Sequence, residues 1–164
     1  MILILHNIRS VHNVGSAFRT ADAAGVSRII LSGYTPTPLD RFGRARSDFT
    51  KVSLGAEKSV PWTYIKTLSP TITKLKKEGC CVVAIEQDAR SQNLFEFEPP
   101  QGTELALVLG NEVRGVSKAL LKKCDAILEI PMHGQKESLN VSVTAGIALF
   151  TLYRSSGLAR KCDA

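Results

Sequence analysis

The sequence lacks the features that mark membrane proteins and zinc proteins. No stretch approaches the roughly 18 consecutive apolar residues that a membrane helix needs. The opening apolar run, Ile2–Leu5, is too short for a secretory signal and follows no basic residues. The cysteines form no CxxC pair, and no histidine spacing suggests zinc. We therefore expect a cytoplasmic protein without a membrane partner or a metal, with reduced and mostly buried thiols at Cys80, Cys81, Cys124 and Cys162.

The chain also has no internal repeat, no low-complexity tract and no stretch typical of a linker. Its 164 residues predict one domain, residues 1–164, large enough for a hydrophobic core and without an appended RNA-binding module. Basic residues exceed acidic ones, so the formal charge is +6 at pH 7 and the isoelectric point is about 9.3. This excess favours polyanionic partners such as nucleic acids or phosphate-bearing ligands.

Short apolar runs alternate with segments of helical character. Strands are expected at Ile2–Leu5, Arg28–Leu31, Pro61–Ile65 (an edge), Cys80–Ile85, Leu105–Leu109 and Ile127–Ile130. Helices are expected at Val14–Ala24 (capped by Asn13 and ended by Gly25), Thr50–Lys58 (interrupted at Gly55), from Ser69-Pro70 to Gly79, Ser117–Lys123, and from Asn140 to Gly157. The alternation predicts parallel βαβ units with helices on both faces of the sheet, which is an α/β/α fold.

Three polar loops carry the functional signal. Leu107–Ser117 and Ile130–Gly146 each run from a buried strand through a glycine-containing polar loop into a helix, and Asn13–Asp22 lies near the N-terminus. In parallel α/β proteins the ends of such strands deliver their loops to one edge of the sheet, where ligands bind. We therefore expect a ligand site built from these loops.

The loop from Gly110 to Gly115 does not match the common nucleotide-binding patterns. It is neither G-x-G-x-x-G nor a P-loop, because lysine follows Ser117 and not Gly115. Its glycines allow close approach of the backbone to a ligand, although an ordinary strand-to-helix turn has the same composition. Glu112 either holds loops together or contacts a substrate, and Arg114 is a candidate salt-bridge partner for it.

The loop after residue 130 mixes apolar side chains with exposed backbone. Its apolar lining comes from Ile130, Met132 and Leu139. Such a lining suits a flat aromatic ring whose edges are met by backbone N–H and C=O groups. Ser138 and Asn140 place short polar side chains at a helix start, either as site residues or as helix caps.

The loop near the N-terminus carries Asn13, Gly15 and Arg19. If a helix starts near Val14, its N-terminus and the Arg19 guanidinium together form a candidate anion site, since arginine suits bidentate phosphate contact. The alternative is a surface salt bridge from Arg19 to Asp22, three residues further along the same helix.

Taken together, the three segments resemble the SpoU (TrmH-type) class of the SPOUT superfamily of RNA methyltransferases. The first motif of that family, N-x-G-x-x-x-R-T-A, is matched by Asn13, Gly15, Arg19, Thr20 and Ala21. The second, G-N-E-x-x-G, is matched by Gly110, Asn111, Glu112 and Gly115, and the third, I-P-M…S-L-N-V-S, by Ile130–Met132 and Ser138–Ser142. The motifs occur in the family's order, and the resemblance covers nearly the whole chain.

The resemblance implies a methyltransferase that uses S-adenosylmethionine to methylate ribose 2′-hydroxyls of tRNA or rRNA. It also implies a C-terminal deep trefoil knot over about residues 80–157, and a homodimer in which the last helix and the start of the first pack across the interface. Sequence physics alone would not suggest a knot, because true knots are rare. In such a dimer the catalytic arginine can serve a site built largely by the other subunit.

Carried over position by position, the resemblance assigns roles to single residues. The catalytic set is Arg19, Asn13, Glu112, Ser138 and Asn140. The cofactor-binding set is Ile85, Glu86, Leu109, Gly110, Asn111, Gly115, Ile130, Met132, Ser138 and Leu139. Because a guanidinium keeps its proton up to a pKa above roughly 12, we expect Arg19 to bind a phosphate and stabilise developing alkoxide charge rather than act as a base.

We expect neither the N-terminal extension nor the separate substrate domain that many relatives use to hold RNA, and we therefore expect the methyltransferase domain itself to bind it. The candidate RNA-binding residues are Arg9, Arg19, Arg41, Arg44, Arg46 and Lys51, although a solvated basic loop has the same composition. The compact form favours tRNA over rRNA. Two other functions stay open: a non-catalytic RNA-binding protein, and an enzyme that methylates a base nitrogen.

Overall fold

The computed structural model describes residues 1–155. Its centre is a seven-stranded sheet in the order β3-β2-β1-β6-β4-β7-β5, and every neighbouring pair of strands is parallel. The strands are β1 (Ile2–His6), β2 (Arg28–Ser32), β3 (Trp62–Ile65), β4 (Cys81–Ile85), β5 (Gln92–Asn93), β6 (Leu105–Leu109) and β7 (Ala126–Glu129). The helices are α1 (Val11–Ala23), α2 (Ser47–Ser53), α3 (Ala56–Ser59), α4 (Leu68–Lys77), α5 (Lys118–Leu121) and α6 (Val141–Ser155), with a short 3-10 turn, η1 (Leu94–Glu96).

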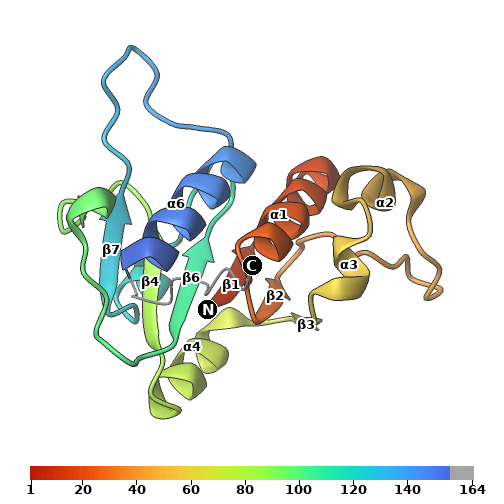
Figure 1. Ribbon diagram of the computed structural model, residues 1–164, viewed down its shortest axis with the longest axis horizontal. Coiled ribbons are helices and arrows are strands. Elements are labelled where there is room, and N and C mark those ends of the chain that lie inside the picture. The colour runs from red at the N-terminus through yellow and green to blue at the C-terminus, as the bar shows by residue number, and fades with distance from the viewer. Residues whose placement is uncertain (156–164) are drawn as a thin grey trace, which may run out of the picture.

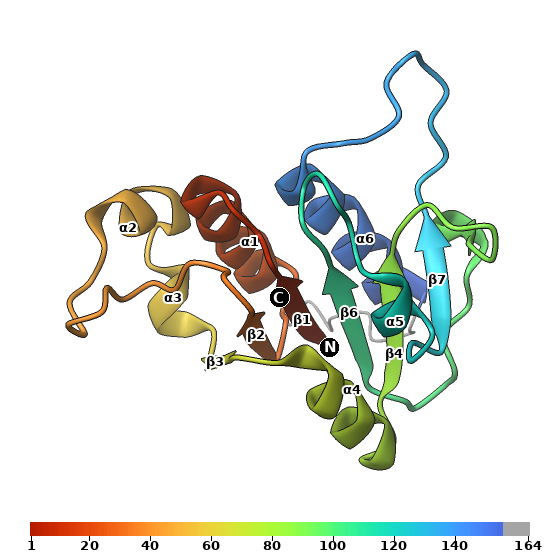
Figure 2. The same cartoon turned by 180° about the vertical axis from the view of Figure 1, so that it is seen from behind.

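Helices cover both faces of this sheet, so the predicted parallel α/β/α arrangement is confirmed. Figure 1 shows α1 and α6 side by side on one face, with α2 and α3 beyond α1. Figure 2 shows α4 and α5 on the opposite face. The two faces have separate cores because side chains alternate along each strand. In β1, Leu3 and Leu5 join one core, whereas Ile2 and Ile4 join the other.

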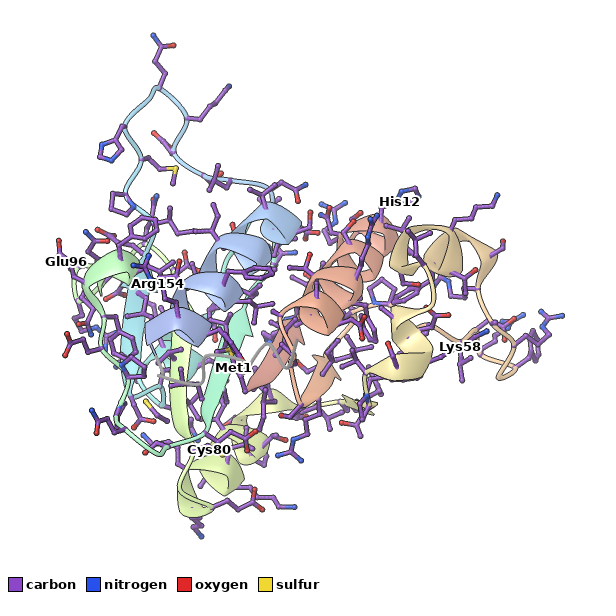
Figure 3. The ribbon with its side chains drawn as sticks, in the orientation of Figure 1. Met1, His12, Lys58, Cys80, Glu96 and Arg154 are labelled. Atoms are coloured by element: carbon purple, nitrogen blue, oxygen red, sulfur yellow. The ribbon has the colours of Figure 1, made fainter. Side chains whose placement is uncertain are left out.

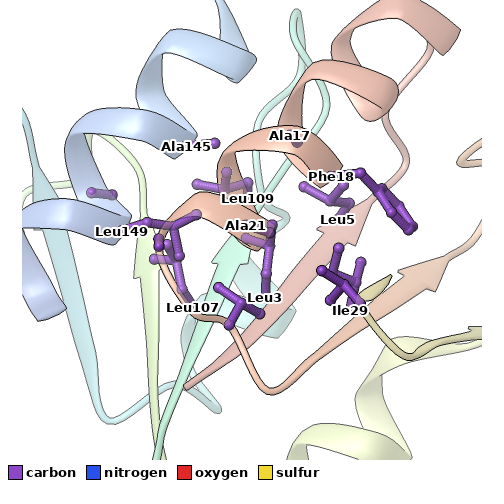
Figure 4. Close-up of a cluster of buried hydrophobic side chains, with 14 of the residues drawn as sticks. Leu3, Leu5, Ala17, Phe18, Ala21, Ile29, Leu107, Leu109, Ala145 and Leu149 are labelled. Carbon is purple, nitrogen blue, oxygen red and sulfur yellow. The ribbon is translucent and has the colours of Figure 1, made fainter. Parts of the chain in front are cut away.

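The core beneath α1 and α6 positions these two helices. Figure 4 shows Leu3, Leu5, Leu107 and Leu109 of the sheet beneath residues of both helices, among them Phe18 of α1. The two helices pack against each other, and small side chains lie buried on both of them: Ala17 and Ala21 on α1, Ala145 and Ala148 on α6. Small residues let two helix backbones approach closely, so the start of α1 and the start of α6 are held close together.

Gly15 explains part of the first motif by packing alone. A Cβ atom at this position would lie 3.1 Å from Cβ of Val52 and 3.2 Å from the carbonyl oxygen of Phe49. Both neighbours belong to α2, which packs across α1. Gly15 therefore allows the α1–α2 crossing, and its side of α1 faces the protein interior rather than a ligand.

The structure corrects two predicted helix caps. Helix α1 is capped by Ser10, whose hydroxyl accepts a hydrogen bond from the N–H of Asn13; Asn13 therefore lies in the first turn and is not the cap. Helix α4 begins at Leu68 after Thr67, not after Ser69. At each helix start two residues with a hydroxyl or amide side chain lie within three positions of each other: Ser10 and Asn13 at α1, Thr67 and Ser69 at α4. The sequence does not distinguish them, and the path of the chain decides which one occupies the N-cap position.

Several element boundaries also differ from prediction. The interruption predicted at Gly55 is confirmed, because Leu54 and Gly55 both adopt left-handed conformations between α2 and α3; the difference is that α2 begins at Ser47 rather than Thr50. Strand β4 begins at Cys81 rather than residue 80, and β7 spans Ala126–Glu129. Helix α5 is shorter than the predicted Ser117–Lys123. The edge strand β5 and the turn η1 have no apolar run of their own and were not predicted.

The described cysteines behave as buried or partly buried thiols. Cys80, Cys81 and Cys124 are free, and Cys80 and Cys81 pack into opposite cores, as predicted for neighbours near a strand. Burial, with a smaller contribution from Asp125, raises the pKa of the Cys124 thiol to about 11. Cys162 and the predicted helix end at Gly157 lie outside the described residues. Among residues 1–155, no helix combines the length and the apolar character needed to span a membrane.

Candidate functional site

A cleft of about 290 Å³ lies where β4, β6 and β7 end. The three strands end at Ile85, Leu109 and Glu129, and because the sheet is parallel their carboxyl ends meet at one edge. Every residue predicted to bind a cofactor lines this cleft: Ile85, Glu86, Leu109, Gly110, Asn111, Gly115, Ile130, Met132, Ser138 and Leu139. The structure thus brings together residues from three loops; the role predicted for each one stays a prediction.

The loop after β6 is closed tightly by its own contacts. The N–H of Gly115 donates to the carbonyl of Asn111 at 2.9 Å, and the Glu86 carboxylate accepts from the N–H of Val116 at 2.6 Å. A Cβ atom on Gly110 would lie 2.5 Å from the carbonyl carbon of Gly115, and one on Gly115 would lie 2.0 Å from Oε2 of Glu86. The two glycines are therefore required first by the packing of the loop itself.

Glu112 closes the N-terminal end of α1. Its carboxylate accepts hydrogen bonds from the backbone N–H groups of Arg9 and Ser10, at 3.0 and 3.3 Å, and from the side-chain amides of Asn13 and Asn111. Figure 3 marks this end of α1 with His12. The anion site predicted at this helix start is thus occupied by a carboxylate of the protein. Among the described residues, Glu112 forms no ion pair with Arg114.

Two opposing effects act on the charge of Glu112. Partial burial raises the pKa of its carboxyl group, but hydrogen bonds from its own backbone N–H, from Arg9, from Asn13 and from Ser10 outweigh burial. The net result is a pKa below the ordinary glutamate value. Glu112 is therefore an anion at neutral pH, which suits an anchor for N–H donors better than a proton acceptor.

Asn13 joins all three motif segments. Its amide nitrogen donates to Glu112 at 3.1 Å, and its amide oxygen accepts from the side-chain nitrogen of Asn140 at 3.1 Å. Asn140 in turn caps α6, because its side-chain oxygen accepts from the N–H of Ser142 at 2.8 Å. The capping alternative for Asn140 is correct, and the same side chain also links the two helix starts. These links place Asn13 and Asn140 beside the cleft without lining it.

Arg19 lies outside the cleft of its own chain. It is exposed on α1, six residues beyond Asn13, and it does not line the cavity. Within residues 1–155 it has no ion pair, so the predicted salt bridge to Asp22 is not formed; Asp22 instead accepts from the hydroxyl of Ser59 at 2.7 Å. The cation is available to a group that approaches α1 from outside.

The predicted RNA-binding loop is ordered by its own ion pairs. Arg44 binds Asp40, and Arg46 binds Asp48 through two nitrogens, with shortest distances of 2.8 Å in each pair. Arg41 lies against the ring of Phe42, 4.7 Å from the centroid. Lys51 is exposed on α2, and Arg9 is exposed in front of α1. The arginines therefore differ: two are partly neutralised by carboxylates, and Arg41 is not.

Sequence reasoning missed residues that complete the edge of the sheet. Asn7 follows β1 with a left-handed backbone, φ 57°, and its carbonyl accepts from the side chain of Asn111 at 2.9 Å. Gln87 donates to the carbonyl of Glu137 at 2.6 Å and so ties the loop after β7 to the end of β4. A usable signal existed, since each residue is polar and follows a buried strand. No group of acidic, histidine and cysteine side chains suited to a metal occurs within residues 1–155.

Comparison with known proteins places this geometry in a family. The sequence profile of the SpoU rRNA Methylase family matches residues 1–150. The 23S rRNA (guanosine-2′-O-)-methyltransferase RlmB of Ralstonia nicotianae is 35% identical over 156 residues, which are 94% of this chain and 58% of that protein. The chain thus spans somewhat more than half the length of the curated relatives it matches.

Solved structures agree with the fold. An rRNA methyltransferase from Sinorhizobium meliloti with bound AdoMet has a TM-score of 0.83 and 30% identity, covering 93% of this chain and 55% of that one. A structure described as giving insight into the 2-OH methylation of C/U34 on tRNA has a TM-score of 0.77 and 26% identity, covering 94% of both chains. With the family profile matched over nearly the whole described structure, and the three motif segments joined through Asn13, this chain belongs to the SpoU rRNA Methylase family.

Proposed function

We propose that the protein transfers a methyl group from S-adenosylmethionine to a ribose 2′-hydroxyl of RNA. The observation that carries this proposal is the hydrogen-bonded link from Glu112 through Asn13 to Asn140, which joins the three family segments beside one cleft. Relatives of more than 30% identity carry this activity in their names. The cofactor and the reaction are inferred for this chain from its membership of the family and from the chemistry of the cleft.

The cleft suits the proposed cofactor. Its lining is apolar at Ile85, Leu109, Ile130 and Met132, and it includes Gly110 and Gly115, which have no side chain. Such a site accepts a purine ring between aliphatic side chains while backbone groups meet its polar edges. Glu86 and Ser138 add polar side chains. Bound S-adenosylmethionine supplies an electrophilic methyl group; this chain supplies the shape of the cleft and the fixed loops.

Arg19 is proposed to act on the RNA. Its guanidinium stays protonated at neutral pH, so it binds the phosphate next to the target ribose and stabilises negative charge that develops on the attacking oxygen. The hydroxyl proton passes to solvent or to another acceptor. Because Arg19 is exposed on α1 and does not line its own cleft, it is proposed to reach the cleft of a second subunit.

A homodimer through α1 and α6 follows from the surface of these helices. Val143 and Phe150 on α6 are 49% and 53% exposed, and they lie seven residues apart, hence on one side of the helix. Ile147 between them is only partly buried. An apolar stripe of this kind on a helix is typical of an interface. The proposed occupant is the same stripe of a second copy, which brings the partner's α1 alongside.

The substrate is proposed to be tRNA rather than rRNA. The support is the likeness of fold to the structure described in terms of C/U34 on tRNA, which matches 94% of this chain with a TM-score of 0.77. The same proposal includes one methyltransferase domain acting in the cytoplasm.

A C-terminal trefoil knot is also proposed. It is supported by the path of the chain, because β7 lies beyond β4 in the sheet while the following helix α6 returns to pack against α1. Tracing the chain in a crystal structure would test it.

The function is tested by incubating the purified protein with S-adenosylmethionine labelled in its methyl group and with bulk unmodified tRNA or rRNA. Digestion to nucleosides and chromatography then locate the label. We expect 2′-O-methyl nucleosides, and from tRNA more than from rRNA. Label in a base would instead support a base-nitrogen methyltransferase. No label with either RNA, from protein that binds the cofactor, would support a non-catalytic RNA-binding protein.

A further inference from the structure

Tyr34 is an exposed aromatic residue held in a fixed orientation beside the cleft. Its side chain is 57% exposed, yet both of its ends are anchored. The hydroxyl oxygen accepts a hydrogen bond from the side-chain nitrogen of Asn111 at 3.0 Å, and its backbone N–H donates to the side-chain oxygen of Asn7 at 3.3 Å. An aromatic ring that is both exposed and held in one orientation is suited to binding a ligand.

The turn that presents Tyr34 is built for this position. Gly33 has φ +68°, and a Cβ atom there would lie 1.8 Å from the side-chain oxygen of Asn7. The side-chain nitrogen of Asn7 forms a hydrogen bond with Nε2 of His6 at 3.0 Å. The hydroxyl of Tyr64 donates to the carbonyl of Gly33 at 2.6 Å. The backbone before Tyr34 is therefore fixed from two sides, and the ring loses little freedom when a ligand binds.

Tyr34 lies where two surface depressions meet. One depression is lined by Arg9, Tyr34, Asn111, Val113 and Arg114, and it shares Asn111 and Val113 with the methyl-donor cleft. The other lies between Tyr34, Tyr64 and the basic loop, which is the predicted RNA-binding loop that carries Arg41, Arg44 and Arg46. A continuous path thus leads from the cleft across Tyr34 to the basic loop.

The charges along this path suit a polyanion. Arg9 and Arg114 flank Tyr34 on the side of the cleft, and within residues 1–155 neither forms an ion pair. Arg41 and Arg44 lie on the other side, around the ring of Phe42 at 4.7 and 5.1 Å. Aromatic faces interleaved with cations are how proteins hold single-stranded nucleic acids, because each base stacks while each phosphate meets a cation.

We propose that Tyr34 is a stacking site for an unpaired RNA base next to the ribose that is methylated. The base stacks on the ring, and Arg9 and Arg114 hold the flanking phosphates. The site deepens the proposed function, on which it rests, by naming the form of RNA that the protein takes: a single-stranded or looped segment whose base has left its helix. A regular duplex has no such base to offer.

The test compares binding of two RNA probes by fluorescence anisotropy: a labelled decauridylate and a labelled ten-base-pair RNA duplex. Tyr34→Ala removes the ring, Tyr34→Leu keeps apolar bulk without it, and Tyr34→Phe keeps the ring without the hydroxyl. The control is Phe95→Ala, which removes an aromatic ring of similar exposure, 56%, from η1. Thermal unfolding and calorimetric binding of S-adenosylmethionine check that each variant is folded.

We expect Tyr34→Ala and Tyr34→Leu to bind decauridylate about tenfold more weakly than the wild type, as loss of one stacked base predicts. Tyr34→Phe keeps the ring but loses the hydrogen bond from Asn111, so it should lose less affinity than Tyr34→Leu. Phe95→Ala should bind decauridylate like the wild type, and duplex binding should not change in any variant. Wild-type affinity in both Tyr34→Ala and Tyr34→Leu would overturn the proposal. So would equal weakening in Tyr34→Phe, or a wild-type protein that does not bind decauridylate.

The outcome is separable from that of the methylation assay. Ring-dependent binding of decauridylate without any methyl transfer would leave the stacking site standing and remove the proposed function. Methyl transfer to 2′-hydroxyls with Tyr34→Ala at full RNA affinity would do the reverse.

Discussion

Several side chains at the site bind backbone N–H groups of neighbouring loops. Glu112 gathers N–H groups at the start of α1, and Asn13 passes that link on to Asn140. Gly110 and Gly115 allow one loop to fold onto itself and onto Glu86. At this scale the chemistry of the site depends on the exact shape of the loops, so small substitutions are expected to have measurable effects.

Gly110 offers a steric test of the loop. In Gly110→Ala the new Cβ would lie 2.6 Å from the backbone nitrogen of Val116, and backbone cannot yield cheaply. We expect stability to fall by about 1–3 kcal/mol and S-adenosylmethionine to bind more weakly, as measured by chemical denaturation and calorimetry. The matched control is Gly134→Ala, since a Cβ there meets nothing within 4 Å. Equal behaviour of the two variants would contradict this account.

Glu112 gives a prediction about pH. Its folded-state pKa lies below the ordinary value of 4.5, so its contribution to stability is present above that pH and is lost as the pH falls through the folded-state pKa. Glu112→Gln should therefore unfold more easily than the wild type at pH 7, by less than about 1 kcal/mol because the exposed carboxylate is screened by solvent, and the difference should shrink below pH 4.5. Urea denaturation at several pH values measures this.

The control for Glu112 is Glu98→Gln. Glu98 is exposed and makes no hydrogen bond among residues 1–155, so this change removes a charge without removing an anchor. It should leave stability the same at every pH. A difference between wild type and Glu112→Gln that persists unchanged in acid would mean that the carboxylate charge is not what the N–H donors require.

Arg19 separates cofactor binding from turnover. Because it is exposed on α1 and outside the cleft, Arg19→Ala should bind S-adenosylmethionine with unchanged affinity in calorimetry. Methyl transfer should fall about a hundredfold or more, the usual effect of removing a group that stabilises transition-state charge. Arg28→Ala, an exposed arginine at the start of β2, should keep full activity. Near-normal turnover in Arg19→Ala would remove the catalytic assignment.

At the scale of elements, α1 organises the site by what its different sides contact. One side packs on the sheet through Val14, Phe18 and Ala21, and Gly15 admits α2. The start of the helix holds Glu112, and the outer side presents Arg19. Helix α6 runs beside it and carries the exposed apolar stripe of Val143 and Phe150. The two helices thus connect the cleft, the arginine that is proposed to be catalytic, and the proposed dimer face.

The dimer face is tested on α6. Phe150→Glu places a charge in the middle of the apolar stripe, and burying an unpaired charge at an interface is costly. We expect a dimeric wild type and a monomeric variant in size-exclusion chromatography with light scattering, together with loss of methyl transfer. Leu54→Glu, at a side chain that is 64% exposed at the end of α2, should stay dimeric. A monomeric wild type would refute the proposed interface.

At the scale of the whole molecule, charge and shape act together. The formal charge of +6 attracts polyanions, including the proposed RNA substrate, from any direction, but a uniform attraction does not position a ribose. Arg44 and Arg46 are already paired with Asp40 and Asp48. Arg9, Arg41 and Arg114 form no ion pair within residues 1–155, so these three give the attraction a direction. RNA affinity should therefore depend on salt, and single cations should contribute unequally.

Arg41 and Lys77 test this inequality. Both changes to alanine remove one positive charge, but Arg41 lies in the basic loop and Lys77 at the end of α4 on the opposite face of the sheet. A plot of the logarithm of affinity for bulk tRNA against that of salt concentration should lose about 0.7–0.9 of slope in Arg41→Ala. Lys77→Ala should keep the wild-type slope. Equal slopes in all three proteins would argue against the predicted footprint.

Much of the fold was predictable because it depends on local pattern. Apolar runs such as Leu105–Leu109 indicated buried strands, and their alternation with helical segments indicated a parallel sheet, since these signals are properties of neighbouring residues. The predicted boundaries were wrong where two nearby residues could each cap the helix, as with Ser10 and Asn13 at the start of α1. The short strand β5 failed because two residues of a sheet edge carry no pattern of their own.

The sequence by itself determined which segments matter, because the motifs are contiguous and their residue types restrict their chemistry. Only the tertiary structure decided what each residue contacts. Asn13 and Asn140 are 127 positions apart, and Asn111 and Tyr34 are 77 apart, so no local pattern could pair them. The parallel sheet brings these loops to one edge, where packing and hydrogen bonding choose the partners. That choice made Glu112 an anchor, left Arg19 outside its own cleft, and set Tyr34 beside it.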